Sequence, residues 1–341
     1  MMKRVVFGRL AMVAMVAMVA MMAATLASCA RGADEAGGIE LALFTKNQTN
    51  PYFQSVRLGA DNAAARLGVS MAHYVPTRPD SIPDQMSQIE DAIIKRPDAV
   101  MFVPVDFQAM VPGVEKLNAA GIPVVNLIDQ SAGGRFVSFV GCDDLRLGRD
   151  SARYLLQKLN GRGHVVILEG VGGSSNSKVR VAGFMDAIAE FPDVKLLASQ
   201  PGNFQRLQAL QVTENLLQAH AQIDGIMAAN DSMALGAIEA LDAANRTALV
   251  TGINGTKEAV DAIKAGKLLA SPDCNGFVLG CIATMVAVRH LRGEPVPAEF
   301  QFPQPVVDAA NYGDLDLPDA QRSCPSWESV AETHAGASSG G

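Results

Sequence analysis

The chain has 341 residues, of which 49% are hydrophobic and 18% are charged, so its length and composition predict about two packed domains and exclude a disordered protein. Its net charge of −7 becomes −10 when residues 1–28 are set aside, because the 28 basic residues fall to 25 against 35 acidic ones. An acidic body without a basic stripe argues against nucleic acid as a partner.

The N-terminus is typical of a targeting segment. Lys3 and Arg4 precede an apolar core from Leu10 to Met22, and small residues follow, as in an export signal. The segment ends Leu26-Ala27-Ser28-Cys29, which resembles a lipobox, so residues 1–28 are expected to be removed and Cys29 to carry a lipid.

An uncleaved transmembrane anchor is the alternative, since the stretch from Leu10 to Ser28 is almost long enough to span a bilayer. Both alternatives place the body outside the cytoplasmic membrane, in the periplasm or at the cell surface. Residues 29–38 then form a tether.

Short apolar runs alternate with helical patterns through the body. The strand-like runs are Ile39–Thr45, Val69–Val75, Ala99–Val105, Pro123–Ile128, Arg135–Gly141, His164–Val171, Val194–Ser199, Ile223–Ala229, Ala248–Ile253 and Leu268–Ser271. Strands that alternate with helices of this length predict an α/β fold with parallel sheets. Ten strands exceed one comfortable sheet, so we expect two lobes.

We place the boundaries of these lobes where the chain is expected to cross from one set of strand–helix units to the other. The N-terminal lobe is expected to comprise residues 39–142 plus 275–303, and the C-terminal lobe residues 143–274 plus 304–312. The pattern dissolves in residues 313–341, and the small residues from Ala335 to Gly341 are expected to form a disordered tail.

The first candidate site follows the first strand. In Asn50-Pro51-Tyr52-Phe53, Asn is a good helix cap and Pro a helix start. Tyr52 and Phe53 therefore project at the edge where ligands of parallel sheets bind, and such rings cover the C–H face of a sugar. Core packing of Phe53 is the alternative.

Polar groups follow other strands. Asp129 ends the fourth strand and is a candidate acceptor, with a turn aspartate as the alternative. The loop from Gly172 to Arg180 fails both phosphate-binding glycine patterns, so it is interpreted as presenting Lys178 or Arg180 to a ligand, with a solvated surface pair as the alternative. Phe204 stands at a further strand–helix junction.

Asn230 and Asp231 lie between the strand from Ile223 to Ala229 and the helix that opens at Ser232. Amides and carboxylates suit a neutral, hydroxyl-rich ligand, although Asp231 could merely cap the helix. Asn254 ends the next strand, and Cys274 lies at the second passage between lobes.

Cysteine and histidine indicate no chemistry. Cys142, Cys274, Cys281 and Cys324 lack zinc spacing, and could form one or two disulfides or remain buried thiols. The five histidines form no metal motif, and no catalytic motif is present. We therefore expect a binding protein without cofactor or metal, and not an enzyme.

At this point the chain from about Ile39 to Ala309 resembles the bacterial periplasmic sugar-binding proteins of the ribose-binding type, whose fold LacI-type repressors share. The resemblance is carried most specifically by Asn50-Pro51-Tyr52-Phe53, Gly121-Ile122-Pro123-Val124, Ala198-Ser199-Gln200-Pro201 and Asn230-Asp231-Ser232-Met233-Ala234-Leu235-Gly236, and less closely by Gly252-Ile253-Asn254-Gly255-Thr256.

The resemblance implies two Rossmann-like lobes joined by a three-crossing hinge, the type I periplasmic binding fold. It implies ligand contacts from Asn50, Tyr52 and Phe53 in one lobe, and from Lys178 or Arg180, Phe204, Asn230 and Asn254 in the other. Ribose-type proteins usually show Asp-Arg where this chain has Ile128-Asp129, Arg for Lys178, Asp for Asn254 and Gln for Cys274.

These departures imply a ligand other than ribose, namely another monosaccharide, a polyol such as an inositol, or a sugar derivative. The resemblance implies a monomeric lipoprotein that delivers this ligand to an ABC permease. A sensor subunit that presents the ligand to a membrane receptor is the alternative. A repressor is disfavoured, because the chain has an export segment and lacks a helix-turn-helix.

Overall fold

The computed structural model describes residues 38–300 and 302–338. The predicted export signal, the lipidation site Cys29 and the predicted tether up to residue 37 lie outside these residues. None of the helices in the described ranges is both long and apolar enough to cross a membrane.

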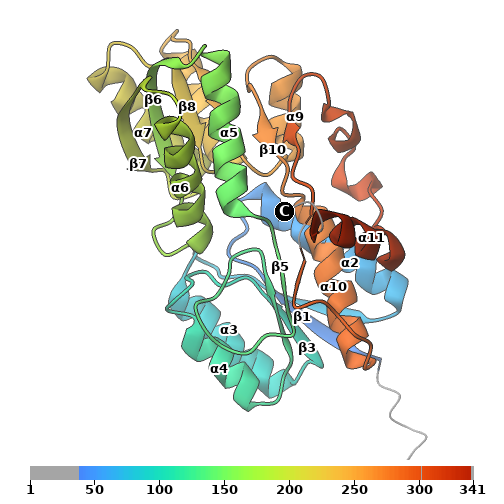
Figure 1. The fold of residues 1–341 in the computed structure, drawn as a ribbon. Helices are drawn as coiled ribbons and strands as arrows, with labels where there is room; N and C mark the ends of the chain where they lie inside the picture. The colour runs from blue at the N-terminus through green and yellow to red at the C-terminus, as the bar shows by residue number, and fades with distance from the viewer. Residues whose placement is uncertain (1–37, 301, 339–341) are drawn as a thin grey trace, which may run out of the picture. The chain divides into compact units, whose positions relative to one another are not determined.

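The N-terminal lobe is built on a six-stranded sheet of order β11-β5-β4-β3-β1-β2, in which each adjacent pair is parallel. Its strands are β1 (Glu40–Phe44), β2 (Ser70–Tyr74), β3 (Ala99–Phe102), β4 (Val124–Leu127), β5 (Ser138–Val140) and β11 (Glu299–Phe300). Helices lie on both faces of this sheet (Figure 1). They are α2 (Pro51–Leu67), α3 (Ile82–Lys95), α4 (Val111–Ala119) and α10 (Gly276–Leu291).

Burial of both faces of β1, β3 and β4 explains why these strands are mostly apolar rather than alternating. Leu41 and Leu43 belong to the core that includes residues of α2 and α10. Ala42 and Phe44 belong to the core that includes residues of α3 and α4. Successive side chains of a strand point to opposite faces, so each apolar run is divided between two cores.

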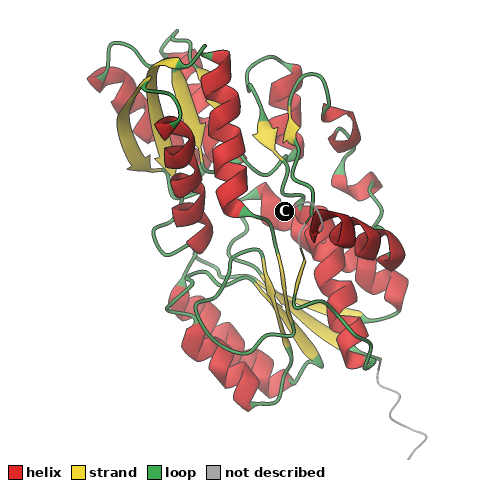
Figure 2. Cartoon of the chain, viewed as in Figure 1, coloured by secondary structure: helices red, strands yellow, loops and turns green. Residues whose placement is uncertain are grey.

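The C-terminal lobe is built on a four-stranded parallel sheet of order β7-β6-β8-β9. Its strands are β6 (Arg162–Glu169), β7 (Asp193–Pro201), β8 (Gly225–Ala228) and β9 (Leu249–Thr251). Helices α5 (Asp144–Lys158), α6 (Ser175–Ala189), α7 (Arg206–Ala219), α8 (Asp231–Ala243) and α9 (Lys257–Lys264) surround it (Figure 2).

The chain passes between the lobes three times: after β5, after β10 (Ser271–Pro272) and before β12 (Val306–Val307). The predicted fold class of two parallel-sheet lobes joined by a three-crossing hinge is therefore confirmed. In the predicted strand Leu268–Ser271, Ala270 pairs parallel with Thr251 of β9 as a single bridge, whereas Ser271 begins β10 and pairs antiparallel with β12. The numerical lobe boundaries stay a prediction.

The C-terminal segment after β12 is ordered into short helices. These are the 3₁₀ helices η1 (Tyr312–Leu315) and η2 (Asp319–Gln321), and α11 (Trp327–Ser338). The predicted disordered tail from residue 335 is therefore wrong as far as Ser338. The ring of Trp327 packs edge to face against Phe300, and Cζ of Arg289 lies 4.3 Å from the Trp327 ring centroid. The cation–π contact between Trp327 and Arg289 stabilises α11 against α10.

Two disulfides account for the four cysteines of the body, Cys142–Cys274 and Cys281–Cys324. The first joins residues at two of the passages between lobes, and the second joins α10 to the C-terminal segment. The sequence alone does not predict which cysteines pair. In the fold, the Cα atoms lie 6.1 Å apart in Cys142–Cys274 and 5.6 Å apart in Cys281–Cys324.

Removal of the second disulfide by Cys281→Ser with Cys324→Ser is expected to lower the free energy of unfolding by about 4 kcal/mol. The bond spans 43 residues, and a loop of that length loses this much chain entropy in the unfolded state when cross-linked. Urea denaturation of the oxidised proteins measures the change. Equal midpoints for the variant and the native chain would contradict this assignment.

Candidate functional site

A cavity lies between the carboxyl ends of the two sheets. About 400 Å³ of space not filled by atoms, open solvent included, lies within it. It is lined by Lys46, Asn47, Asn50, Tyr52, Phe53, Asp80, Ile128, Ser174, Asn176, Arg180, Phe204, Asn230 and Asn254. Seven predicted site residues from both lobes are thus brought together.

The aromatic wall starts at the N-terminus of α2. The side chain of Asn50 accepts a hydrogen bond of 3.0 Å from the backbone N–H of Tyr52, and Pro51 occupies the first turn, so the helix starts where the sequence predicts. The rings of Tyr52 and Phe53 meet edge to face with centroids 5.7 Å apart. Both rings line the cavity and also belong to the core, so the two interpretations of Phe53 are compatible.

Phe204 supplies an aromatic ring from the C-terminal lobe. It stands in the turn between β7 and α7 with a backbone φ of 58°, a conformation that is uncommon for a bulky side chain. The backbone carbonyl of Phe204 accepts a hydrogen bond of 3.3 Å from Nδ2 of Asn230. This bond ties the turn to the start of α8, so the ring and the amide are positioned together.

Arg180 is fixed in the cavity wall by two hydrogen bonds. Its Nε donates to Oδ1 of Asp144 over 2.7 Å, and its Nη1 donates to the carbonyl of Ala229 over 2.8 Å. Helices α5 and α6 approach closely because Gly148 has no Cβ; one there would lie 2.2 Å from the carbonyl oxygen of Arg180.

The Arg180–Asp144 pair is buried, with side-chain exposures of 3% and 10%. Burial raises the pKa of Asp144, and the opposing charge of Arg180 only partly offsets the shift. Nη2 of Arg180 is held by no other residue in the described part of the chain. The fixed guanidinium can therefore donate to a ligand oxygen from a preset direction.

Five asparagines line the cavity, and the side chains of two of them, Asn230 and Asn254, differ in how many hydrogen bonds they already make to the protein. Oδ1 of Asn230 caps α8 by accepting from the N–H of Met233 over 2.9 Å. Asn254 has a backbone φ of 129°, and its buried Oδ1 has no hydrogen-bond partner among the described residues. A buried unsatisfied amide is costly, so Asn254 is the acceptor most in need of a ligand hydroxyl.

Six lining residues were missed by sequence reasoning, namely Lys46, Asn47, Asp80, Ile128, Ser174 and Asn176. Lys46 and Asn47 follow the end of β1 after one residue, Thr45, so the strand-end rule that selected Asn50 could have found them. Asp80 lies in the loop before α3. Burial raises its pKa, which Lys46 and Asn47 partly offset.

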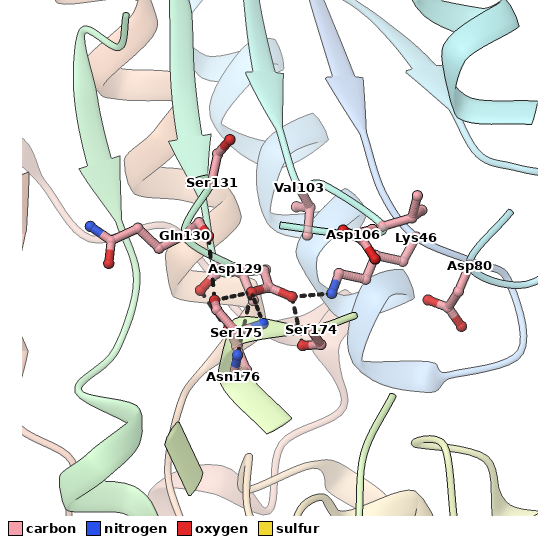
Figure 3. Close-up of polar contacts among 12 residues, drawn as sticks. Lys46, Asp80, Val103, Asp106, Asp129, Gln130, Ser131, Ser174, Ser175 and Asn176 are labelled. Carbon is pink, nitrogen blue, oxygen red and sulfur yellow. Dashed lines mark hydrogen bonds and ion pairs between the residues drawn. The ribbon is translucent and has the colours of Figure 1, made fainter. Parts of the chain in front are cut away.

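Three predicted ligand residues, Asp129, Lys178 and Cys274, do not line this cavity. Asp129 is absent from the lining because its carboxylate is bound by Lys46, Ser174, Ser175 and Asn176 (Figure 3). Burial alone would raise the pKa of Asp129, but the charge of Lys46 and the hydrogen bonds from Lys46 and the serines lower it.

Lys178 and Cys274 are the other two predicted residues that do not line the cavity. Lys178 is exposed, with Nζ 4.5 Å from the ring centroid of Phe107. It lies two residues before Arg180, so the two face opposite sides of a helix and only one can reach the cavity. Cys274 is engaged in the disulfide with Cys142 and lies behind Tyr52, whose hydroxyl is 3.4 Å from its sulfur.

Asp273, next to this disulfide, is a buried carboxyl whose pKa is shifted. Burial, with a contribution from Asp231, raises its pKa from 3.8 to about 7, although Arg322 opposes the shift. Its Oδ1 is buried without a partner among the described residues. The folded chain therefore keeps a proton that the unfolded chain has lost, and stability falls as pH rises from the unfolded pKa to the folded one.

Asp273→Asn is expected to raise the melting temperature at about pH 8 and to change it little near pH 4, because only at high pH must the native carboxyl lose its proton within the fold. Thermal unfolding followed by circular dichroism at both pH values measures this difference. Parallel pH profiles for the native and variant proteins would contradict it.

Comparisons with known proteins agree with this geometry. Residues 41–295 match the periplasmic binding protein domain. The chain is 33% identical over 267 residues to the ribose import binding protein of Haemophilus influenzae, covering 78% of this chain and 90% of that one.

Two solved structures are also similar. A solute-binding protein of an ABC transporter from Actinobacillus succinogenes with bound D-allose aligns with a TM-score of 0.77 and 33% identity, covering 81% of this chain and 99% of that one. A solute-binding protein of an ABC transporter from Bacillus halodurans with bound myo-inositol aligns with a TM-score of 0.78 and 26% identity, covering 83% of this chain and 99% of that one. From its fold, its cavity and these matches, the chain belongs to the family of periplasmic binding proteins.

Proposed function

We propose that this protein captures a small neutral sugar or polyol outside the cytoplasmic membrane and delivers it to an ABC importer. The single observation that carries the proposal is the cavity in which three aromatic rings and five asparagine amides from the two lobes meet. Rings bury the C–H faces of such a molecule, and amides pair with its hydroxyls. The names of the relatives support the same ligand class.

The charge of the cavity favours a neutral ligand. Both cations that line it already have a carboxylate partner, because Lys46 pairs with Asp129 and Arg180 with Asp144. Asp80 adds a carboxyl of raised pKa. A phosphorylated or acidic sugar would bring a negative charge to a wall with no unpaired cation among its lining residues, and burial of such a charge is costly.

Binding and release would follow from motion of the lobes about the three crossings. Tyr52 and Phe53 would hold the ligand from the N-terminal lobe, and Arg180, Phe204, Asn230 and Asn254 would complete its shell when the lobes meet. Contacts made only in the closed arrangement favour closure. The chain would act as a monomer without a cofactor or chemical step, within the lobe boundaries predicted above.

The site of action follows from the predicted N-terminal segment. We infer that cleavage before Cys29 and lipidation of that residue tether the protein to the outer side of the membrane, beside its permease. Mass spectrometry of the mature N-terminus from membranes tests this inference, and an unmodified N-terminus upstream of Cys29 would exclude it.

Isothermal titration with D-allose, myo-inositol, D-ribose, xylitol and the corresponding sugar acids tests the ligand class. We expect at least one neutral member to bind at a single site with a dissociation constant of about 1 μM, equivalent to about 8 kcal/mol. Ribose is expected to be a weaker ligand. Binding of the acids alone, or slow conversion of a bound sugar, would overturn the proposal.

A further inference from the structure

Several polar contacts join the lobes beside the cavity, among them Thr49–Gln205 and Asn50–Ser232, and the one with the most hydrogen bonds is centred on Asp129. Asp129, in the loop after β4 of the N-terminal lobe, reaches the N-terminus of α6 in the C-terminal lobe (Figure 3). Its Oδ1 accepts from the N–H of Ser175 over 3.0 Å, from that of Asn176 over 3.4 Å, and from the hydroxyl of Ser175. Its Oδ2 accepts from the hydroxyl of Ser174 over 2.7 Å and from Lys46. We call this set the Asp129 contact.

The Asp129 contact replaces the ordinary cap of a helix. Ser174 occupies the N-cap position of α6, but its side chain makes no capping hydrogen bond within the helix and donates to Asp129 instead. A carboxylate at a helix N-terminus is favourable because it accepts from free N–H groups and opposes the helix dipole. The cap of α6 is thus supplied by the other lobe.

The acceptor capacity of Asp129 is filled mainly by the C-terminal lobe. A carboxylate offers about four acceptor positions, and among the described groups that donate to Asp129 only Lys46 belongs to its own lobe. Neighbouring bonds extend the contact: Phe107 N–H donates to the carbonyl of Gly173 over 2.9 Å, and Nδ2 of Asn176 to that of Ile128 over 3.4 Å. Separation of the lobes would break all of these except Lys46–Asp129.

We propose that Asp129 is a positioning residue that holds the lobes closed, and that it strengthens ligand binding without touching the ligand. A protein that is already closed for part of the time binds its ligand with an affinity proportional to that fraction. The Asp129 contact raises the fraction because it exists only when the lobes meet. The claim that affinity follows rests on the proposed function, whereas the claim about closure does not.

Ser175→Pro tests the contact with little effect on α6 itself. Ser175 is the first residue of α6 and does not line the cavity, and proline is favoured at that position. The preceding residue, Ser174, is extended with φ −99° and ψ 129°, as proline requires. The variant removes two donors to Asp129, the N–H and the hydroxyl, while Lys46 remains paired.

Lys257→Pro is the matched control. Lys257 is the first residue of α9, it follows an extended Thr256 with φ −65° and ψ 155°, and it makes no contact with Asp129. The control therefore places the same substitution at the same helical position away from the contact. Ser175→Ala, which keeps the N–H, serves as a milder variant if Ser175→Pro folds poorly.

The measurement is a distance distribution between spin labels at Ile94→Cys on α3 and Leu207→Cys on α7, whose native side chains are 79% and 65% exposed. The oxidised full chain is dialysed free of small molecules first, so the result does not depend on any sugar. We expect a major short-distance population in the native and Lys257→Pro proteins, a shift to longer distances in Ser175→Pro, and an intermediate shift in Ser175→Ala.

Distributions that do not differ between native and Ser175→Pro would overturn the proposal, as would an equal shift in Lys257→Pro. Affinity for whichever sugar of the titration panel binds is a second readout. The Ser175→Pro variant is expected to bind about tenfold more weakly, through faster dissociation, because two hydrogen bonds to a charged group are lost. An unchanged dissociation rate in Ser175→Pro would contradict the claim that the Asp129 contact strengthens ligand binding.

Discussion

Replacing Arg180 with glutamine is expected to abolish measurable sugar binding and to lower the free energy of unfolding by about 3–5 kcal/mol. The side chain is buried against Asp144, over 2.7 Å, so the substitution leaves a buried carboxylate without its charge partner. The cavity also loses its fixed guanidinium donor. Calorimetric titration with the preferred sugar and urea denaturation at neutral pH measure the two losses.

Arg153→Gln is the control for this substitution. Arg153 pairs with Glu190 at the surface, where the two side chains are 37% and 42% exposed, and exposed pairs contribute about 0–1 kcal/mol. The control is expected to bind sugar like the native protein and to unfold at nearly the same urea concentration. If Arg180→Gln behaved like this control, Arg180 would have neither role.

Asn254→Gly is expected to separate binding from stability. The variant loses the buried Oδ1 that has no protein partner, and glycine adopts the backbone φ of 129° at that position without strain. Affinity should fall about ten- to hundredfold, because a hydrogen bond to the ligand is lost. The melting temperature of the ligand-free protein should not fall.

Asn160→Gly provides the comparison, since Asn160 also has a positive φ, of 56°, but lies at the end of α5 and does not line the cavity. Affinity of this control is expected to be unchanged. A lower melting temperature in Asn254→Gly with native affinity would mean that the amide is structural, which contradicts its assignment to the ligand.

Local patterns in the sequence predicted the fold and much of the cavity wall. The apolar runs predicted the parallel strands, and the edge at their carboxyl ends could be located because ligands of such sheets bind there. Asn50-Pro51 encodes the start of α2 through its cap and its proline. Asn230 caps α8, which begins at Asp231, so the prediction of a helix that opens at Ser232 with Asp231 as its cap was wrong; the carboxylate of Asp231 accepts from Thr256 and Ser271 instead. The side chains next to the start of α2, Tyr52 and Phe53, line the cavity.

The features that the sequence did not predict depend on contacts between segments far apart in the chain. Asp129 follows a strand as a ligand residue would, yet the N-terminus of α6, some 45 residues later, takes its carboxylate. Lys178 and Arg180 could not be separated by type, and only the packing of α6 on α5 decides which one is buried. Cysteine pairing and the docking of α11 are likewise properties of the assembled fold.

The central claim is that one neutral polyhydroxylated molecule is held between the lobes, and native mass spectrometry of the intact protein tests it most directly. The native chain, purified gently or mixed with the sugar panel, should carry a single adduct with the mass of a monosaccharide or polyol, and the Arg180→Gln chain should carry none. Absence of any adduct in the native chain, or an adduct that persists in Arg180→Gln, would contradict the account.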